Sequence, residues 1–558
     1  MKRISITFAL MLAAGFVWWR IAAQPARVLS DLMPEGALLY LDSPDFSRLI
    51  QEWNASGVKR DWLASTNYDV FTRSNLFGKL GGVYQEYGTA AGFTPDLNSV
   101  IEIAGDQSAL ALYDIHDVQF LYITHVPQNR LASSQLWRVR DKFEERRAAD
   151  IPFYVRTESN RTVAFAFTND YLLLATRDDL MAQALALVSG GKGPSISNSR
   201  WFQHATKAGS NSGELRMALN MEGLLKSSYF RSHWIYRNAS KLEPFESGIA
   251  VVSRDPKQIT ENRVFIREPD EKPELPDDDA RRALAALISM APDDVGLYKA
   301  WAAPDADFVA STIERKLLVA QTAPVINLRY APGAVNTDTS VGAESDLETR
   351  IDEPPLPAGS SGSLDMSKLH QVLDAAHPLA LLQLQSSFAK SGAFVSTPCV
   401  LAIEAETDWD ASALTGSLTT AIETLWTTSG LGAQWVPGTA GAHAIERLDG
   451  LKPLMMLARG RVLFLSNDAD LLAAVLDRRA APGAASTFTY VAALRHSRER
   501  GPYQRLMNAL DSGQPEPRFF SQNIGSLSDV LSFVDDVNVT LADRGDELVK
   551  QITYRLRQ

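Results

Sequence analysis

The sequence predicts an α+β protein of two similar halves, each a mainly antiparallel sheet with helices packed on one face. The strongest observation is a repeat: residues 163–191 and 453–483 both read as strand, polar turn, strand, acidic turn and amphipathic helix. In addition, the predicted strands come in adjacent pairs joined by short turns, as in residues 107–124 and 162–175. Such pairs favour antiparallel hairpins over parallel crossovers.

The repeat extends to both ends of each half. Each half opens on a proline-led strand, at residues 34–42 and 292–301. Each closes on a hairpin of two alternating strands, at residues 248–267 and 536–557. The offset between equivalent segments grows steadily along the chain, which insertions in the second copy would produce. We therefore interpret the chain as an internal duplication.

Between these segments, each half is expected to contain a strand followed by a helix. In the first half the strand is 119–126 and the helix is 130–147; in the second they are 400–406 and 411–427. The charged run at 138–147 is interpreted as a solvated helix face, since its acids and bases alternate at helical spacing.

The helix that ends the central repeat should present one apolar stripe to the sheet. Two acids open it in each copy, Asp178 with Asp179 and Asp468 with Asp470. Negative charge stabilises a helix N-terminus. Helix capping thus accounts for these acids without a catalytic role. The Gly190–Gly191 break that follows is interpreted as a helix terminator.

Composition places the boundary between the halves. Residues 268–279 hold three prolines, seven acids and one leucine, a composition that stays extended and solvated. The expected organisation is a first half at 24–267, this linker, and a second half at 280–558, with Asp279 capping the helix that follows. Residues 333–363, rich in Gly, Ser, Thr, Pro and acids, are expected to form a mobile insert in the second half.

Residues 1–23 have the pattern of a signal peptide or membrane anchor. Lys2 and Arg3 precede an uncharged, mostly apolar run at 4–19, and Arg20 follows. This charge pattern places the rest of the chain across the membrane from the cytoplasm. We expect a membrane-anchored protein with a periplasmic, extracytoplasmic body, or a secreted one if the segment is cleaved after Ala23. The membrane is then a partner through this segment.

Charge and cysteine content exclude some classes of protein. The net charge of −11 argues against nucleic acid as a partner, because phosphate binding needs clustered Lys and Arg. Cys399 is the single cysteine, so no disulfide forms within the chain. Its apolar surroundings indicate a buried strand thiol rather than a nucleophile.

At the opening strand 34–41, the strand pair 164–167 and 171–175, the helix from Asp178 and the terminal hairpin, the chain resembles a bacterial family. That family consists of exported or membrane-anchored proteins and is known only as a domain of unknown function. The resemblance covers most of residues 30–268 and, more loosely, 290–556. It implies export and a duplicated α+β body, and it brings no catalytic residues.

The sequence predicts no catalytic, cofactor-binding or metal-binding residue. None of the eight histidines has a partner one helical turn away; His370 and His377 are two turns apart. No G-x-S-x-G elbow is present, and the sequence Gly359-Ser360-Ser361-Gly362 falls in the expected insert. No cofactor is expected.

Two kinds of function remain. The first is a non-enzymatic structural or partner-binding role in the cell envelope, with a protein or ligand partner that the sequence does not identify. The alternative is an extracytoplasmic hydrolase, or a carrier of a hydrophobic ligand, with its site between the two halves.

Overall fold

The computed structural model describes residues 28–73, 75–158, 160–210, 212–227, 242–318, 364–386, 389–391, 394–426, 434–448, 454–478, 484–502 and 531–557. The predicted signal or anchor at 1–23 and the predicted insert at 333–363 lie outside these ranges. Among the described residues, no helix is long and apolar enough to cross a membrane. The chain divides into two compact units, Met1–Phe46 with Glu86–Gln203, and Ser47–Gln85 with His204–Gln558.

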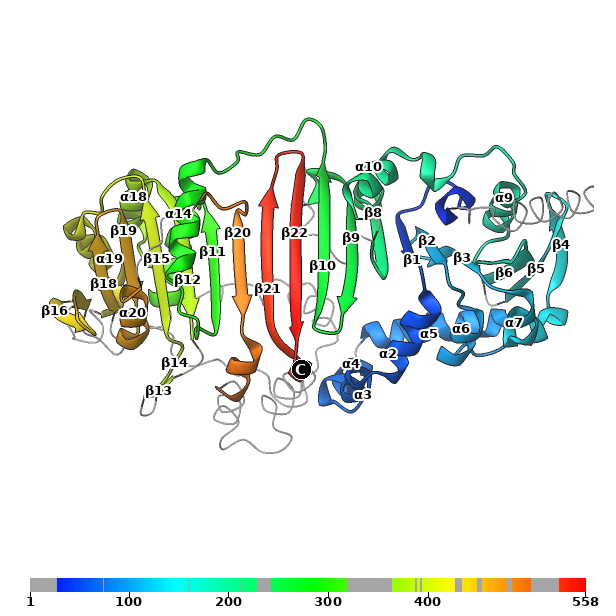
Figure 1. Ribbon diagram of the computed structural model, residues 1–558, viewed down its shortest axis with the longest axis horizontal. Helices are drawn as coiled ribbons and strands as arrows, with labels where there is room; N and C mark the ends of the chain where they lie inside the picture. Colours follow the sequence, from blue (N-terminus) through cyan, green and yellow to red (C-terminus); the bar gives the residue numbers. More distant parts are fainter. Residues whose placement is uncertain are drawn as a thin grey trace, which may run out of the picture. The chain divides into compact units, whose positions relative to one another are not determined.

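The first unit is built on one antiparallel sheet (Figure 1). Each strand pairs with the next in the order β1 (Leu39–Ser43), β2 (Ser108–Asp114), β3 (Gln119–His125), β7 (Tyr171–Ala175), β6 (Arg161–Thr168), β5 (Ile151–Glu158) and β4 (Glu144–Ala148). The edge strand β4 has the sequence EERRA and is almost wholly exposed. Charged side chains on an edge strand discourage pairing with other chains.

Helices cover both faces of this sheet. Phe165 and Leu172 face a cluster formed with α7 (Gln128–Ser133), α8 (Gln135–Arg138) and the end of α5 (Asn75–Ala91). The intervening Ala164 and Leu173 are fully buried and belong to the opposite face, where α9 (Asp178–Val188) contacts β6 and β7.

The second unit contains a longer antiparallel sheet. Its pairing order is β8 (Leu215–Asn220), β9 (Phe245–Asp255), β10 (Gln258–Arg267), β22 (Glu547–Leu556), β21 (Val534–Asp543), β20 (Tyr490–Leu494), β11 (Leu297–Ala302), β12 (Pro378–Gln385), β15 (Cys399–Ala405), β19 (Val462–Ser466), β18 (Leu454–Arg459), β17 (His443–Leu448) and β16 (Trp435–Ala440). A separate small pair joins β13 (Ala389–Ser391) to β14 (Phe394–Ser396).

Helices lie on both faces of this sheet as well, so the prediction that they pack on one face is wrong. Leu401 and Ile403 pack with α15 (Ala306–Ile313), α18 (Ser367–Ala376) and α19 (Ala411–Trp426). Val400 and Ala402 pack with α14 (Asp278–Ser289) and α20 (Ala469–Leu476). Strands buried on both faces read as continuous apolar runs, which is the pattern of residues 399–403.

The remaining helices are short. Between β1 and β2 lie α2 (Phe46–Ala55), α3 (Gly57–Leu63), α4 (Thr66–Thr72) and α6 (Leu97–Ile103). Strand β8 is preceded by α10 (Arg200–Ala208) and followed by α11 (Met221–Lys226). Three-residue to five-residue turns complete the described part, at Leu29–Leu32, Arg140–Lys142, Ile196–Asn198, Glu314–Leu318 and Leu531–Phe533.

The strands β10 and β22, which are far apart in the sequence, are neighbours in the long sheet. Nine residue pairs join them, and Asn262 opposite Gln551 is the middle pair. At one end Arg267 makes two hydrogen bonds of 2.7 Å to the carboxylate of Asp543 and one of 2.8 Å to the carbonyl of Gly545. These contacts hold the end of β10 against the turn between β21 and β22.

The strand–turn–strand–helix prediction is confirmed in both places. It corresponds to β6, β7 and α9, and to β18, β19 and α20. Asp468 caps α20 by accepting a hydrogen bond from the backbone of Leu471, and Asp178 and Asp179 lie in the first turn of α9. Gly190 follows α9 with a φ of 91°, as a helix terminator requires.

Two local predictions are wrong. The expected helix at 130–147 is instead α7, α8, a 3₁₀ turn and strand β4, because the charged run pairs with β5. The helix after the acidic linker is capped by Asp277 rather than Asp279; Asp277 accepts a hydrogen bond of 2.8 Å from the backbone of Ala280. The expected helix at 411–427 is confirmed as α19.

Candidate functional site

A hollow in the surface lies between α18 and α19. Both helices are fixed at the ends that border it. Asp410 starts α19 by accepting hydrogen bonds of 2.8 Å and 3.1 Å from the backbones of Ser412 and Ala413. His377 ends α18 with a left-handed φ of 52°. The two helix axes are therefore held in place by local signals and by the shared core beneath them.

The groove between these helices has a volume of about 720 Å³ and is open to solvent. Its floor on α19 consists of small residues one turn apart. A Cβ atom added at Gly416 would meet no atom within 4 Å, so this part of the floor is unfilled. The lining comes from α18, α19 and the segment between β15 and α19: Lys368, Gln371, Val372, Ala375, Ala376, Thr407, Asp408, Trp409, Asp410, Ala413, Gly416, Ser417 and Thr420.

The polar groups of the groove also serve the local structure. Lys368 donates from Nζ to Oγ1 of Thr420 at 3.3 Å, which bridges the two helices. The indole of Trp409 is buried and donates from Nε1 to the carbonyl of Arg461 at 2.9 Å. Asp410 is engaged in the helix cap. This arrangement offers a polar rim over a small-residue floor, which suits binding of a segment with small side chains.

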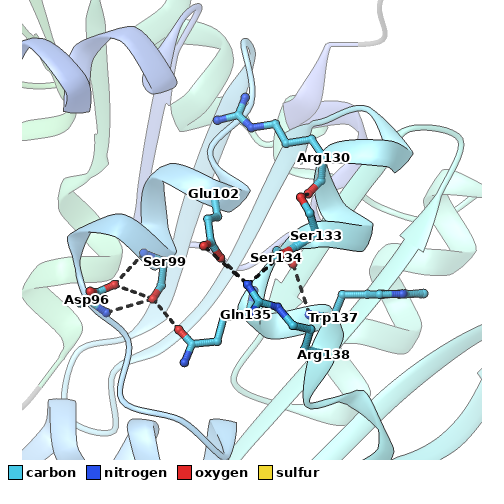
Figure 2. A network of polar contacts seen from close by, with 9 residues as sticks. All are labelled: Asp96, Ser99, Glu102, Arg130, Ser133, Ser134, Gln135, Trp137 and Arg138. Atoms are coloured by element: carbon cyan, nitrogen blue, oxygen red, sulfur yellow. Dashed lines mark hydrogen bonds and ion pairs between the residues drawn. The ribbon is translucent and has the colours of Figure 1, made fainter.

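A second polar cluster, in the first unit, joins α6 to the α7–α8 pair. Figure 2 shows Asp96 accepting hydrogen bonds from the backbone of Ser99 at 2.7 Å and from its hydroxyl at 2.6 Å. The same hydroxyl oxygen lies 3.1 Å from Oε1 of Gln135. The carboxylate of Glu102 accepts a hydrogen bond of 2.8 Å from the backbone of Gln135 and lies 4.0 Å from Arg138.

These contacts are helix caps and hydrogen bonds between neighbouring helices. The hydrogen bond from the Ser99 hydroxyl, followed by that from its backbone, lowers the pKa of Asp96. Asp96 is thus held as a capping carboxylate. The cluster positions α6 against α8, and its groups point at one another rather than into a hollow (Figure 2). We assign it a structural role.

Cys399 lies at the start of β15 and is 1% exposed, as expected of a buried strand thiol. Burial raises the pKa of its thiol to about 12. Burial also lowers the pKa of Lys316, whose charge acts on the same thiol. Because the thiolate is the reactive form, Cys399 is inert at neutral pH in the folded protein.

The histidines that have carboxylate neighbours each pair with a separate acid, in different parts of the fold. His204 lies 3.0 Å from Glu246, His370 lies 2.6 Å from Asp307, and His443 lies 2.9 Å from Asp477. The exposed His116 lies 3.8 Å from the neighbouring Asp117. Within the described ranges, no group of three or more His, Cys, Asp or Glu side chains is arranged to hold a metal ion.

Sequence reasoning did not single out the groove residues. The available signal was the run of small residues Ala413, Gly416, Ser417 and Thr420 on one face of a predicted helix. That signal alone does not reveal a groove, because the second wall comes from α18, more than 30 residues earlier in the chain.

Comparisons with known proteins add little to this geometry. No protein-family model matches the sequence, and no curated protein matches it. Among solved structures, crystal forms III and I of a protein called TP0453 resemble part of the chain, each with 9% sequence identity and a TM-score of 0.26. Each match covers 45% of this chain and 83% of TP0453.

Proposed function

We propose that this chain is a membrane-anchored, extracytoplasmic protein with a non-enzymatic, partner-binding role in the cell envelope. The observation that carries the binding role is the groove between α18 and α19, where an unfilled floor at Gly416 lies beside Lys368 and Asp408. The anchoring rests on the charged and apolar pattern of residues 1–23.

We further propose that the body is an internal duplication, with halves at 24–267 and 280–558 and a linker at 268–279. Strand order supports this. The order β1-β2-β3-β7-β6-β5-β4 has the same form as β11-β12-β15-β19-β18-β17-β16. The hairpin β9-β10, which follows β8, likewise corresponds to β21-β22, which follows β20.

The register between the last strands of the two halves also supports duplication. The first residue of each strand, Gln258 of β10 and Glu547 of β22, faces the ninth residue of the other strand, Arg555 and Ile266, so corresponding positions of the two strands have corresponding partners. This is the pattern expected when two equivalent strands meet about a two-fold axis. It joins the halves edge to edge through backbone hydrogen bonds.

The binding role is tested by crosslinking in cells. A photoreactive amino acid at Thr420 samples the groove, whereas the same group at Ser412 samples an exposed position of the same helix outside it. The proposal expects an adduct at Thr420 that Gly416→Leu abolishes by filling the floor, with none at Ser412. Equal labelling at both positions, unaffected by Gly416→Leu, contradicts it.

The anchoring is tested separately. Alkaline phosphatase fused after residue 558 should be active, and the fusion should stay in the membrane fraction after washing with alkaline carbonate. An inactive fusion contradicts the extracytoplasmic location. A soluble active fusion contradicts the anchor and favours secretion. Turnover of ester or peptide substrates by the purified chain, if abolished by Gly416→Leu, would favour the hydrolase instead.

A further inference from the structure

Helices α2 to α5, drawn in blue in Figure 1, carry a large share of the exposed apolar side chains of the described residues. Seven large apolar side chains are exposed in the described residues, and four of them belong to this short segment. They are Trp53 on α2, Leu63 at the end of α3, and Leu80 and Tyr84 on α5, with 48%, 45%, 54% and 46% exposure. Leu80 and Tyr84 are four residues apart and share one helix face.

The same helices have their own aromatic interior. The ring of Trp62 lies 6.1 Å from that of Tyr68 and 6.4 Å from that of Phe71, which in turn lies 5.4 Å from Phe77. These contacts hold α3, α4 and α5 together, although α3 itself has no buried residue. The exposed apolar side chains are thus carried by an ordered group of helices.

Three glycines in α5 would let another surface approach the backbone of this helix closely. At Gly78, Gly81 and Gly82 a Cβ atom would meet nothing within 4 Å, so no packing in the fold requires glycine there. Glycine within a helix lowers its stability relative to alanine. It also removes the side chain that would keep the helix backbone away from a surface.

The charges of this segment differ from those of the whole chain. Residues 46–91, which span α2 to α5, contain five cationic residues and four acidic ones, whereas the chain carries a net charge of −11. The residues are Arg48, Lys59, Arg60, Arg73 and Lys79 against Glu52, Asp61, Asp69 and Glu86. Exposed Trp, Tyr and Leu together with an excess of cations is typical of helices that lie in a lipid headgroup region.

We propose that α2 to α5 rest on the surface of an anionic lipid bilayer, with Trp53, Leu63, Leu80 and Tyr84 entering the headgroup region. The cationic residues attract acidic headgroups, and the apolar side chains lose contact with water. This contact rests on the proposed anchoring, since residues 1–23 would bring the body to the membrane. It adds a second attachment and so restrains the orientation of these helices.

The test uses the full chain reconstituted in vesicles and one fluorophore that reports local polarity. In a Cys399→Ala background, the fluorophore is attached at Trp53→Cys or, as a control, at Leu275→Cys, an equally exposed apolar position in the linker. Vesicles contain either phosphatidylglycerol with phosphatidylcholine or phosphatidylcholine alone. Circular dichroism checks that each variant is folded.

The proposal expects a shift of emission to shorter wavelength at position 53 in anionic vesicles, reduced by high salt and by Arg73→Glu but not by Arg73→Lys. Position 275 should not shift. An unshifted position 53 in protein that floats with the vesicles overturns the contact and leaves the anchor standing. Protein that does not float refutes the anchor instead. A shift at 53 that depends on protein concentration without lipid overturns the proposal in favour of self-association.

Discussion

Replacing Arg267 by methionine should destabilise the second unit by about 3 kcal/mol, because it leaves a largely buried carboxylate without its main partner. The side chains of Arg267 and Asp543 are 9% and 16% exposed, and two hydrogen bonds of 2.7 Å join them. Arg267 also lies 5.4 Å from the ring centre of Phe245. Breaking a buried pair costs ~3–5 kcal/mol, and the residual exposure places this one at the lower end.

The assay is urea unfolding followed by circular dichroism and by labelling of Cys399, the one cysteine, which reports opening of the same sheet. Arg254→Met is the matched control. Arg254 also contacts two carboxylates, those of Glu52 and Glu214, from β9, but its side chain is 32% exposed. Its loss should cost about 0–1 kcal/mol.

The double variant Arg267→Met with Asp543→Leu should recover most of the loss, because apolar groups then replace both charges. The reasoning is refuted if Arg267→Met costs no more than Arg254→Met, or if the double variant is as unstable as the two single changes added together.

Three further predictions concern single residues. Gly416→Ala should raise the free energy of unfolding by about 0.5–1 kcal/mol, because alanine favours a helix over glycine and its methyl group meets no atom within 4 Å. Crosslinking in the groove should fall. Lower stability of this variant in urea would contradict the prediction. Cys399 should resist a thiol reagent at pH 8 in the folded protein and react at once in urea, because burial raises its pKa; rapid reaction of the folded protein would contradict this burial. Burial lowers the pKa of His496 below 6.5, so the unfolded chain gains the proton first as the pH falls. Stability should therefore be lost below about pH 6.5, and His496→Gln should flatten that slope in melts from pH 7 to pH 5; an unchanged slope would contradict it.

Local patterns were sufficient for the elements whose signals lie within a few residues of one another. The two strands and helix at β6, β7 and α9 follow from alternation, a turn and two acids at a helix start. The same holds for the cap of α20 by Asp468. These elements can be predicted without knowing any distant residue, because hydrogen bonds between residues three or four positions apart determine the turn and the helix start.

The run Glu144–Ala148 shows where this reasoning fails. Glu and Arg favour helices, and their spacing suggested a solvated helix face. Its strand conformation is decided by β5, whose residue Val155 lies opposite Glu144. A charged edge strand lacks the alternation of apolar residues by which strands are predicted. Its pairing with a neighbouring strand overrides the helix propensity of its residues.

By itself the sequence determined the α+β class, the antiparallel hairpins and the burial of Cys399. Tertiary structure alone decided that helices cover both faces of each sheet, that β10 pairs with β22, and that α18 and α19 leave a groove at Gly416. The physical reason is the distance along the sequence between the residues that interact. A strand pattern tells which side chains are buried, but the partner that buries them is chosen by packing across hundreds of residues.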